Sequence, residues 1–149
     1  EWKPGRGLLG PLMPLLGDWR AEAELNGHTM VCTRSFQSFG KGWIRLEAVW
    51  HMGARGDYRE TALFGAGDNG ALGVFSFTND GKRSVGRLAD GSDVHPLAIA
   101  FEAQMPAGLA RMLYWPAEDG DGFRFAVESR NRTGWRRFML HTYRPRAAS

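Results

Sequence analysis

A chain of 149 residues, of which 43% are hydrophobic, can form one domain with its own core and has little length for a second. The formal net charge of +3 is too small to require nucleic acid or another polyanion as a partner. The single cysteine, Cys32, excludes an intramolecular disulfide, and no apolar run reaches the ~18 residues that a membrane-spanning helix needs.

The N-terminal segment, residues 1–16, contains an apolar stretch at 8–16 that one glycine and two prolines interrupt. These residues limit a helix to one or two turns, so we expect a short helical lid across one end of the domain. Residues 17–145 are expected to form a β-barrel domain, and residues 146–149 a C-terminal tail. No linker or internal repeat divides the chain further.

From residue 19 onward, runs of strand-forming residues alternate with turn signals. Asn-Gly and Asp-Gly pairs are typical of tight hairpins, whose backbone needs the positive φ angles that these residues tolerate. Short loops predict antiparallel strands in chain order, and closure removes the two exposed edges of the sheet. The sequence therefore predicts an all-β fold, a single closed antiparallel up-and-down barrel of about ten strands. The predicted strands are 19–25, 29–39, 43–52, 58–65, 71–78, 82–89, 97–104, 109–115, 123–130 and 135–143.

Gly17-Asp18-Trp19 stands at the start of the first predicted strand, directly after the short helix. The triplet resembles the Gly-x-Trp signature that opens the barrel of the calycin superfamily, which includes lipocalins and fatty-acid-binding proteins. The closing stretch 134–144, Gly-Trp-x-x-x-Met-x-x-x-Tyr-Arg, is similar to that of small bacterial calycin-like proteins of unknown function. The resemblance implies a barrel around a small-molecule cavity, with Trp19 plugging one end.

A second resemblance is to the nitrobindin-type haem barrels, which also have ten strands. Their opening motif continues as Gly-x-Trp-x-Gly-x-Gly, whereas residues 20–23 here read Arg-Ala-Glu-Ala and lack the glycines that admit the flat haem. Their haem ligand is a histidine on the closing strand, where this chain has His141. Haem held by His141 is therefore an alternative, and it predicts a Soret band with haemin that His141→Ala removes. No other cofactor is expected.

Side chains on the last predicted strand, 135–143, alternate between two faces. One face carries Trp135, Arg137, Met139, His141 and Tyr143. This mixture of aromatic, soft and polar groups is typical of a ligand cavity. Because an arginine and a phenol supply several directed donors, Arg137, His141 and Tyr143 are predicted to hold the polar end of a ligand, such as a carboxylate. Fatty-acid-binding barrels are similar in using an arginine and a tyrosine there. In the alternative, the opposite face points inward and Arg137 lies on the surface.

Four aromatic residues are expected to line or plug the cavity: Trp19, Trp50, Phe75 and Trp135. The third predicted strand, 43–52, alternates between a wholly apolar face that includes Trp50 and a face that includes Glu47, so the apolar face is predicted to be buried. On the second strand, Cys32 is interpreted as a small core residue. Arg34 is interpreted as a solvated strand residue, with a charge that points into the cavity as the alternative. A register slip of one residue would exchange these faces.

Taken together, the residues predict binding of a small apolar or amphipathic ligand inside the barrel. An enzyme that acts on a small molecule is a further alternative, with His141, Tyr58 or Glu60 as acid or base, although no catalytic constellation is visible. No histidine or cysteine cluster predicts a structural metal site. The arginines of the last hairpin are interpreted as a solvated rim, so no nucleic-acid or membrane partner is expected, and a homodimer is left open. With no leader recognised and no disulfide, we expect a cytoplasmic protein.

Overall fold

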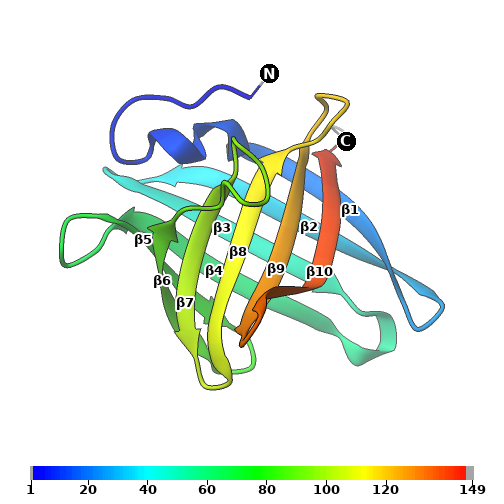
Figure 1. Ribbon diagram of the computed structural model, residues 1–149. Coiled ribbons are helices and arrows are strands. Elements are labelled where there is room, and N and C mark those ends of the chain that lie inside the picture. The colour runs from blue at the N-terminus through cyan, green and yellow to red at the C-terminus, as the bar shows by residue number, and fades with distance from the viewer. Residues whose placement is uncertain (1, 147–149) are drawn as a thin grey trace.

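The computed structural model describes residues 2–146 and shows ten antiparallel strands closed into one barrel (Figure 1). The strands are β1 (Gly17–Leu25), β2 (His28–Phe39), β3 (Trp43–His51), β4 (Asp57–Ala66), β5 (Leu72–Thr78), β6 (Arg83–Ala89), β7 (Ile99–Met105), β8 (Gly108–Pro116), β9 (Phe123–Asn131) and β10 (Gly134–Pro145). Each strand pairs with its sequence neighbours, and β10 pairs with β1 to close the sheet. The predicted closed up-and-down barrel is therefore confirmed. Of the predicted tail, residues 147–149 lie outside the described residues.

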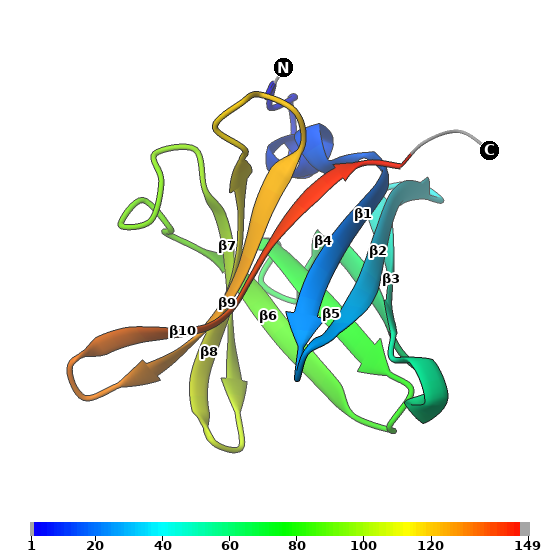
Figure 2. The same ribbon diagram turned by 90° about the vertical axis from the view of Figure 1, so that its right-hand side faces the viewer.

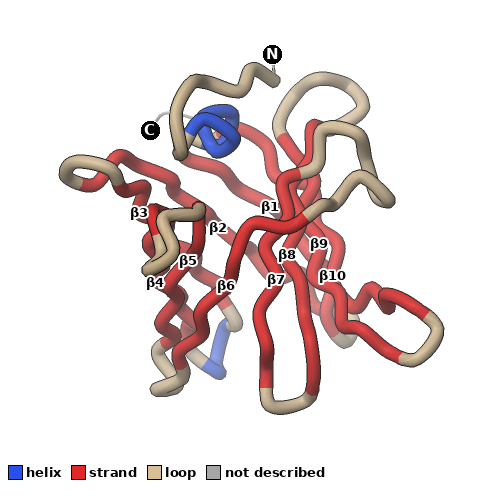
Figure 3. The backbone as a smooth tube through the Cα atoms, turned by 60° about the vertical axis from the view of Figure 1, so that its left-hand side comes forward, coloured by secondary structure: helices blue, strands red, loops and turns tan. Residues whose placement is uncertain are grey.

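Successive connections of the barrel lie at alternate ends (Figure 3). The turns that join β1 to β2, β3 to β4, β5 to β6, β7 to β8 and β9 to β10 lie at one end, here called the hairpin end. The short 3-10 helix η2 (Gly53–Arg55) is part of the β3–β4 turn. Gly27 and Gly81, in two of these turns, have φ angles of 79° and 85°, which explains why the turn signals in the sequence include glycine.

The N-terminal segment contains one 3-10 helix, η1 (Gly10–Leu15), and the predicted helical lid is not confirmed. Leu12 and Leu15 of η1 are fully buried in the main core. The indole Nε1 of Trp19 donates a hydrogen bond to the carbonyl oxygen of Leu15 at 2.7 Å, which ties η1 to the first strand. The segment lies across the end of the barrel opposite the hairpin end (Figure 1), so it closes the far end and leaves the hairpin end uncovered.

The barrel buries alternate residues of its strands, as the sequence pattern predicts. On β3, Ile44, Leu46 and Ala48 are each 1% exposed, whereas Glu47 lies outside and accepts a hydrogen bond from Thr61. Aromatic residues fill much of the interior. They include Phe36, Phe64, Phe101, Tyr114, Phe123, Phe125 and Tyr143. The core is therefore built mainly from aromatic rings that contact one another across the barrel.

A β-bulge divides β10 into two parts. Arg137 pairs with Glu128 of β9 and Met139 pairs with Val127, which leaves Phe138 without a partner residue. One extra residue reverses the alternation of side chains along β10. Odd-numbered residues therefore face outward before the bulge and inward after it. The interior receives Met139, His141 and Tyr143, and the outer side receives Trp135 and Arg137. The prediction that these five residues share one face is therefore wrong.

The bulge also shapes the barrel around β10. Its pairing with β1 is short and joins Trp19 to Pro145 and Arg20 to Arg144. Figure 2 shows the β9–β10 hairpin bending away from the barrel and projecting as an arm at the hairpin end. Bulges increase the local bend and twist of a strand, which accounts for this projection.

Candidate functional site

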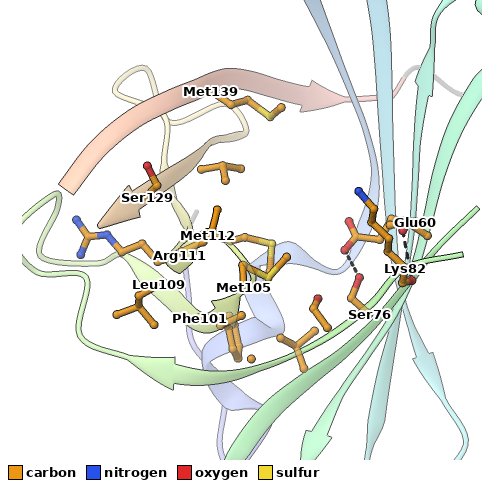
Figure 4. A pocket seen from close by; sticks show the side chains of 18 of the residues that line it. Glu60, Ser76, Lys82, Phe101, Met105, Leu109, Arg111, Met112, Ser129 and Met139 are labelled. Carbon is orange, nitrogen blue, oxygen red and sulfur yellow. Dashed lines mark hydrogen bonds between the residues drawn. The ribbon is translucent and has the colours of Figure 1, made fainter. Parts of the chain in front are cut away.

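The barrel contains a cavity of about 450 Å³, lined mainly by strands β4 to β10 (Figure 4). Its mouth lies at the hairpin end, where the exposed residues Met105 and Phe138 belong to its lining. The apolar wall includes Val74, Phe101, Leu109, Met112, Phe125, Val127 and Met139. A concave space of this size with an apolar lining suits a small apolar or amphipathic molecule.

Polar groups are gathered on the wall that β4 and β5 form. The hydroxyl of Ser76 donates a hydrogen bond to the Glu60 carboxylate at 2.5 Å (Figure 4). Glu60 is 9% exposed, and Tyr58 and Thr78 line the cavity beside it. Lys82, in the β5–β6 turn, also belongs to the lining, and its Nζ lies 3.9 Å from Oδ2 of Asp80. The cavity lining thus has one acidic residue, Glu60, and the basic residues Lys82, Arg83 and Arg111 also belong to it.

Arg34 of β2 lies directly behind this wall and is 1% exposed. Its Nη2 donates a hydrogen bond to the hydroxyl oxygen of Tyr114 at 2.7 Å and lies 3.8 Å from Oε1 of Glu60. The guanidinium carbon lies 4.1 Å from the ring centroid of Phe125 and 5.8 Å from that of Trp50. Because Glu60, Phe125 and Trp50 all line the cavity, only the side chains of its wall separate this charge from the cavity.

Several buried polar atoms around Arg34 have no hydrogen-bond partner among the described residues. They are Nε and Nη1 of Arg34, Nε1 of Trp50, Nδ1 of His141 and the hydroxyl of Tyr143. A buried donor without a partner costs roughly 1–3 kcal/mol, and more when it carries charge. Most of these atoms are donors, so a group that accepts hydrogen bonds would satisfy them best.

The electrostatic surroundings explain the ionisation of this cluster. Burial disfavours the charge on Arg34, but the phenols of Tyr114 and Tyr143 and the Glu60 carboxylate together hold the pKa of Arg34 above its usual value. Burial lowers the pKa of His141, and the Arg34 charge lowers it further, so this imidazole is neutral at pH 7. The Arg34 charge is therefore permanent and has no close, fully paired counter-ion.

Burial likewise raises the pKa of the Cys32 thiol to about 11, although the nearby Arg34 charge acts in the opposite direction. Cys32 is fully buried in the main core. At neutral pH it is an unionised core side chain, in agreement with its interpretation from the sequence, and it supplies no nucleophile to the cavity.

Four of the predicted ligand-binding residues face the interior. Trp50 lines the cavity, whereas His141 and Tyr143 belong to the region around Arg34. Trp19 packs edge-on against Phe123, with ring centroids 4.9 Å apart, at the end that η1 closes. The predicted residues are thus distributed between the cavity wall, the buried polar cluster and the closed end.

Three predicted residues lie outside the barrel. Arg137 donates to Oε2 of Glu128 at 2.9 Å, and the Trp135 ring lies against the Arg111 guanidinium, whose carbon is 4.2 Å from the ring centroid. Both are on the outer side because the bulge reverses the alternation of β10. Phe75 packs against Trp43 on the outer face of β5, where its strand partners are Leu63 and Val85. The predicted pairing of Arg137 with Tyr143 across one cavity does not occur.

Arg34 is the functional candidate that the sequence interpretation assigned to solvent, and that interpretation is wrong. The signal was present in the alternation of β2, because Arg34 shares a face with Cys32 and Phe36, which are 0% and 1% exposed. Arginine is rarely fully buried in proteins, and for this reason the sequence interpretation placed Arg34 in solvent despite its apolar neighbours on β2. Ser76, the partner of Glu60, carried no comparable signal.

The residues do not fit haem ligation in the predicted way. His141 presents a neutral imidazole with an unpartnered Nδ1, but it is not part of the cavity wall, whereas its strand neighbour Met139 is. A flat group held in the cavity would therefore not meet this imidazole. Within residues 2–146, no group of three or more histidine, cysteine, aspartate or glutamate side chains is placed to hold a metal ion.

Comparison with known proteins gives the fold and not the function. No protein-family model matches the chain, and no curated protein matches it. Among solved structures, the chain is similar to the crystal structure of Rv2717c from M. tuberculosis, with 16% sequence identity and a TM-score of 0.58. The match covers 95% of this chain and 99% of that one. In the described part of the chain, no helix has the length and hydropathy of a membrane span.

Proposed function

We propose that this protein is a calycin-type barrel that binds a small amphipathic molecule bearing a carboxylate or a similar acceptor group. The apolar part of the ligand lies in the cavity of about 450 Å³, and its polar end reaches the Arg34 cluster. The observation that carries the proposal is the buried Arg34 guanidinium, which has two unpartnered nitrogens behind a mainly apolar cavity wall. The Gly17-Asp18-Trp19 opening of β1 supports the calycin part.

The chemistry of the cluster favours an acceptor that carries a negative charge. Arg34 offers Nε and Nη1, and Trp50 adds the indole Nε1 from the cavity wall itself. Hydrogen bonds between a guanidinium and a carboxylate are shorter and stronger than those between neutral groups. Glu60 competes for the same charge but lies 3.8 Å from Nη2, so its interaction with Arg34 leaves the other nitrogens free.

The test compares decanoic acid with decan-1-ol, which share an apolar chain and differ at the polar end. Binding to the wild type and to Arg34→Met is measured by calorimetry. Loss of a charge-assisted hydrogen bond should weaken binding of the acid by about ten- to a hundredfold. Binding of the alcohol should change little, because the cavity itself is kept. Methionine is unbranched and flexible and fits an apolar surrounding, so the fold should be retained.

Arg137→Met is the matched control, since Arg137 lies outside the barrel, bound to Glu128. It should leave the affinity for both compounds unchanged. An equal loss for acid and alcohol in Arg34→Met would contradict the carboxylate assignment. Failure of the wild type to bind either compound would contradict the cavity as a site for such ligands.

A further inference from the structure

The mouth of the cavity is bounded by three hairpins, β5–β6, β7–β8 and β9–β10. Each contributes residues to the cavity lining, namely Lys82 and Arg83, Met105 and Ala107, and Phe138. All three turns lie at the hairpin end, away from η1, and the β9–β10 hairpin points sideways, away from the other two (Figures 2 and 3). The surface formed by residues 77–85, 103–110 and 129–138 is here called the mouth surface.

Positive charge is concentrated on the mouth surface. It contains the basic residues Lys82, Arg83, Arg130, Arg132, Arg136 and Arg137 and one acidic residue, Asp80. Its net charge of +5, or +4 when Arg137 is counted with its ion-pair partner Glu128, exceeds the +3 of the whole chain, so the remainder of the molecule carries a net negative charge. Arg132 and Arg136 are exposed and form no ion pair with the described residues. The charge asymmetry therefore directs the cavity mouth toward anionic surfaces.

Apolar side chains project from the same surface. Phe138 is 62% exposed, Val85 63%, Phe77 53% and Met105 37%. Phe138 is exposed because the bulge removes it from the regular pairing of β10 and turns it toward the rim of the cavity. Phe138 and Met105 belong to the lining of the apolar cavity and are surrounded by cations, so they differ from an ordinary solvated rim, whereas Phe77 and Val85 lie on the outer face of β5 and β6.

We propose that the mouth surface docks on the surface of an anionic lipid bilayer, with the arginines at the lipid headgroups and Phe138 and Met105 inserted among them. Basic residues near an anionic bilayer attract it, and apolar side chains beside them insert at the headgroup level. A single-stranded nucleic acid fits less well, because it needs successive aromatic platforms, whereas of the exposed apolar residues at the cavity rim only Phe138 is aromatic. This docking goes beyond ligand binding and revises the expectation that no membrane partner exists.

The experiment is co-sedimentation of the full chain with vesicles of phosphatidylcholine alone and with vesicles containing phosphatidylserine at three parts in ten. The wild type should bind the anionic vesicles and not the neutral ones, and added salt should weaken the binding. Arg132→Glu with Arg136→Glu should weaken it at least about thirtyfold, since each basic residue near the surface contributes about a fivefold factor and the new charges repel the lipid. Phe138→Ser should also weaken vesicle binding.

The matched control is Arg6→Glu with Arg146→Glu, which changes the net charge by the same amount at the end near η1. Both residues are exposed and form no ion pair with the described residues. This variant should bind anionic vesicles like the wild type. Equal losses in the two double variants, or no binding of the wild type to anionic vesicles, would overturn the proposal. Binding to poly(U) RNA in place of vesicles, lost only in the mouth variant, would also overturn it.

The docking proposal and the proposed ligand site can be disproved separately, because they are tested by different measurements on the same variant. Arg132 and Arg136 do not line the cavity, so their double variant should bind decanoic acid in vesicle-free buffer with wild-type affinity. Loss of vesicle binding with retained acid binding supports the docking proposal. Loss of both vesicle binding and acid binding in this variant would show that its fold is damaged. The milder double variant Arg132→Gln with Arg136→Gln then replaces it in the test. Unchanged vesicle binding by that variant would count against docking.

Discussion

Two buried arginines, Arg34 inside the barrel and Arg111 on its outer side, have opposite hydrogen-bonding states. Arg111 is 3% exposed, and its Nη1 and Nη2 donate to the two oxygens of Asp93 at 2.9 and 2.7 Å. Its Nε and Nη2 also donate to Oε1 of Glu128, at 2.9 and 2.7 Å. Arg34 is equally buried but has one neutral hydroxyl as a partner and a carboxylate at 3.8 Å.

The difference separates a structural arginine from a candidate binding residue. Arg111 joins three parts of the chain, because Asp93 lies in the β6–β7 connection and Glu128 on β9. Its guanidinium stacks on Trp135, so its donors and its flat face are both occupied. Arg34 also lies against an aromatic ring, but two of its nitrogens remain free. Burial alone does not mark a site, whereas burial combined with unused donors does.

The largest expected effect is on stability. Arg111→Met should lower the free energy of unfolding by about 3 kcal/mol, because it removes the main partner of the buried Glu128 carboxylate. Arg34→Met should lower it by less, about 1 kcal/mol, since Glu60 lies 3.8 Å from the guanidinium and keeps the hydrogen bond from Ser76 when Arg34 is removed. Urea unfolding of both variants measures the difference.

Arg87→Met provides the background for this comparison, because Arg87 is exposed on β6 and forms no ion pair with the described residues. It should unfold at the wild-type urea concentration. A larger loss of stability in Arg34→Met than in Arg111→Met would show that Arg34 is the structural arginine and would remove the contrast.

The next effect concerns the one carboxylate near Arg34. Glu60→Gln should strengthen binding of decanoic acid by about tenfold, because it removes the negative charge that competes for Arg34 at 3.8 Å. Glutamine keeps an acceptor for the Ser76 hydroxyl. Calorimetry with the acid and with decan-1-ol shows whether the gain is limited to the charged ligand.

Glu47→Gln is the control, because Glu47 lies on the outer face of β3. The affinity for both compounds should stay unchanged in this variant. Weaker acid binding in Glu60→Gln would mean that Glu60 helps to hold the ligand. That result would favour the alternative in which the protein is an enzyme with Glu60 as an acid or base.

Much of the barrel was predictable because its signals are local. Tight turns need residues that tolerate positive φ, and these appear in the sequence at the hairpins found in the structure. The buried face of β3 followed from alternation alone, since every residue on that face is apolar. η1 was less predictable, because Pro11 and Pro14 limit the helix but do not decide between α and 3-10 geometry.

The site was only partly predictable, because two of its determinants are not local. The bulge at Phe138 depends on how β10 pairs with β9, and no residue type in the sequence specifies it. It moved Arg137 outside and left His141 and Tyr143 inside. The burial of Arg34 depends on Tyr114 and Phe125, which are distant in the sequence and meet it only across the closed barrel.

The smallest effect concerns His141, whose pKa responds to the Arg34 charge. Burial is the main cause that holds this pKa below the usual 6.5 in the folded protein, and the Arg34 charge is the second cause. The unfolded chain therefore takes up a proton first as the pH falls. The stability contribution of the neutral imidazole is present above about pH 6.5 and is lost as the pH falls below that value. Arg34→Met should raise the pKa of His141 toward 6.5, as NMR titration of the imidazole protons measures.

Arg111→Met serves as the counterpart in this titration and should leave the pKa of His141 unchanged. The Arg111 charge is compensated by Asp93 and Glu128 and does not contribute to the shift of His141. An equal response to both substitutions would mean that a general loosening of the barrel, rather than the charge of Arg34, sets the ionisation of the interior. A response to Arg34→Met alone would establish that the interior holds an incompletely paired positive charge within reach of His141, which is the property that an acidic ligand needs.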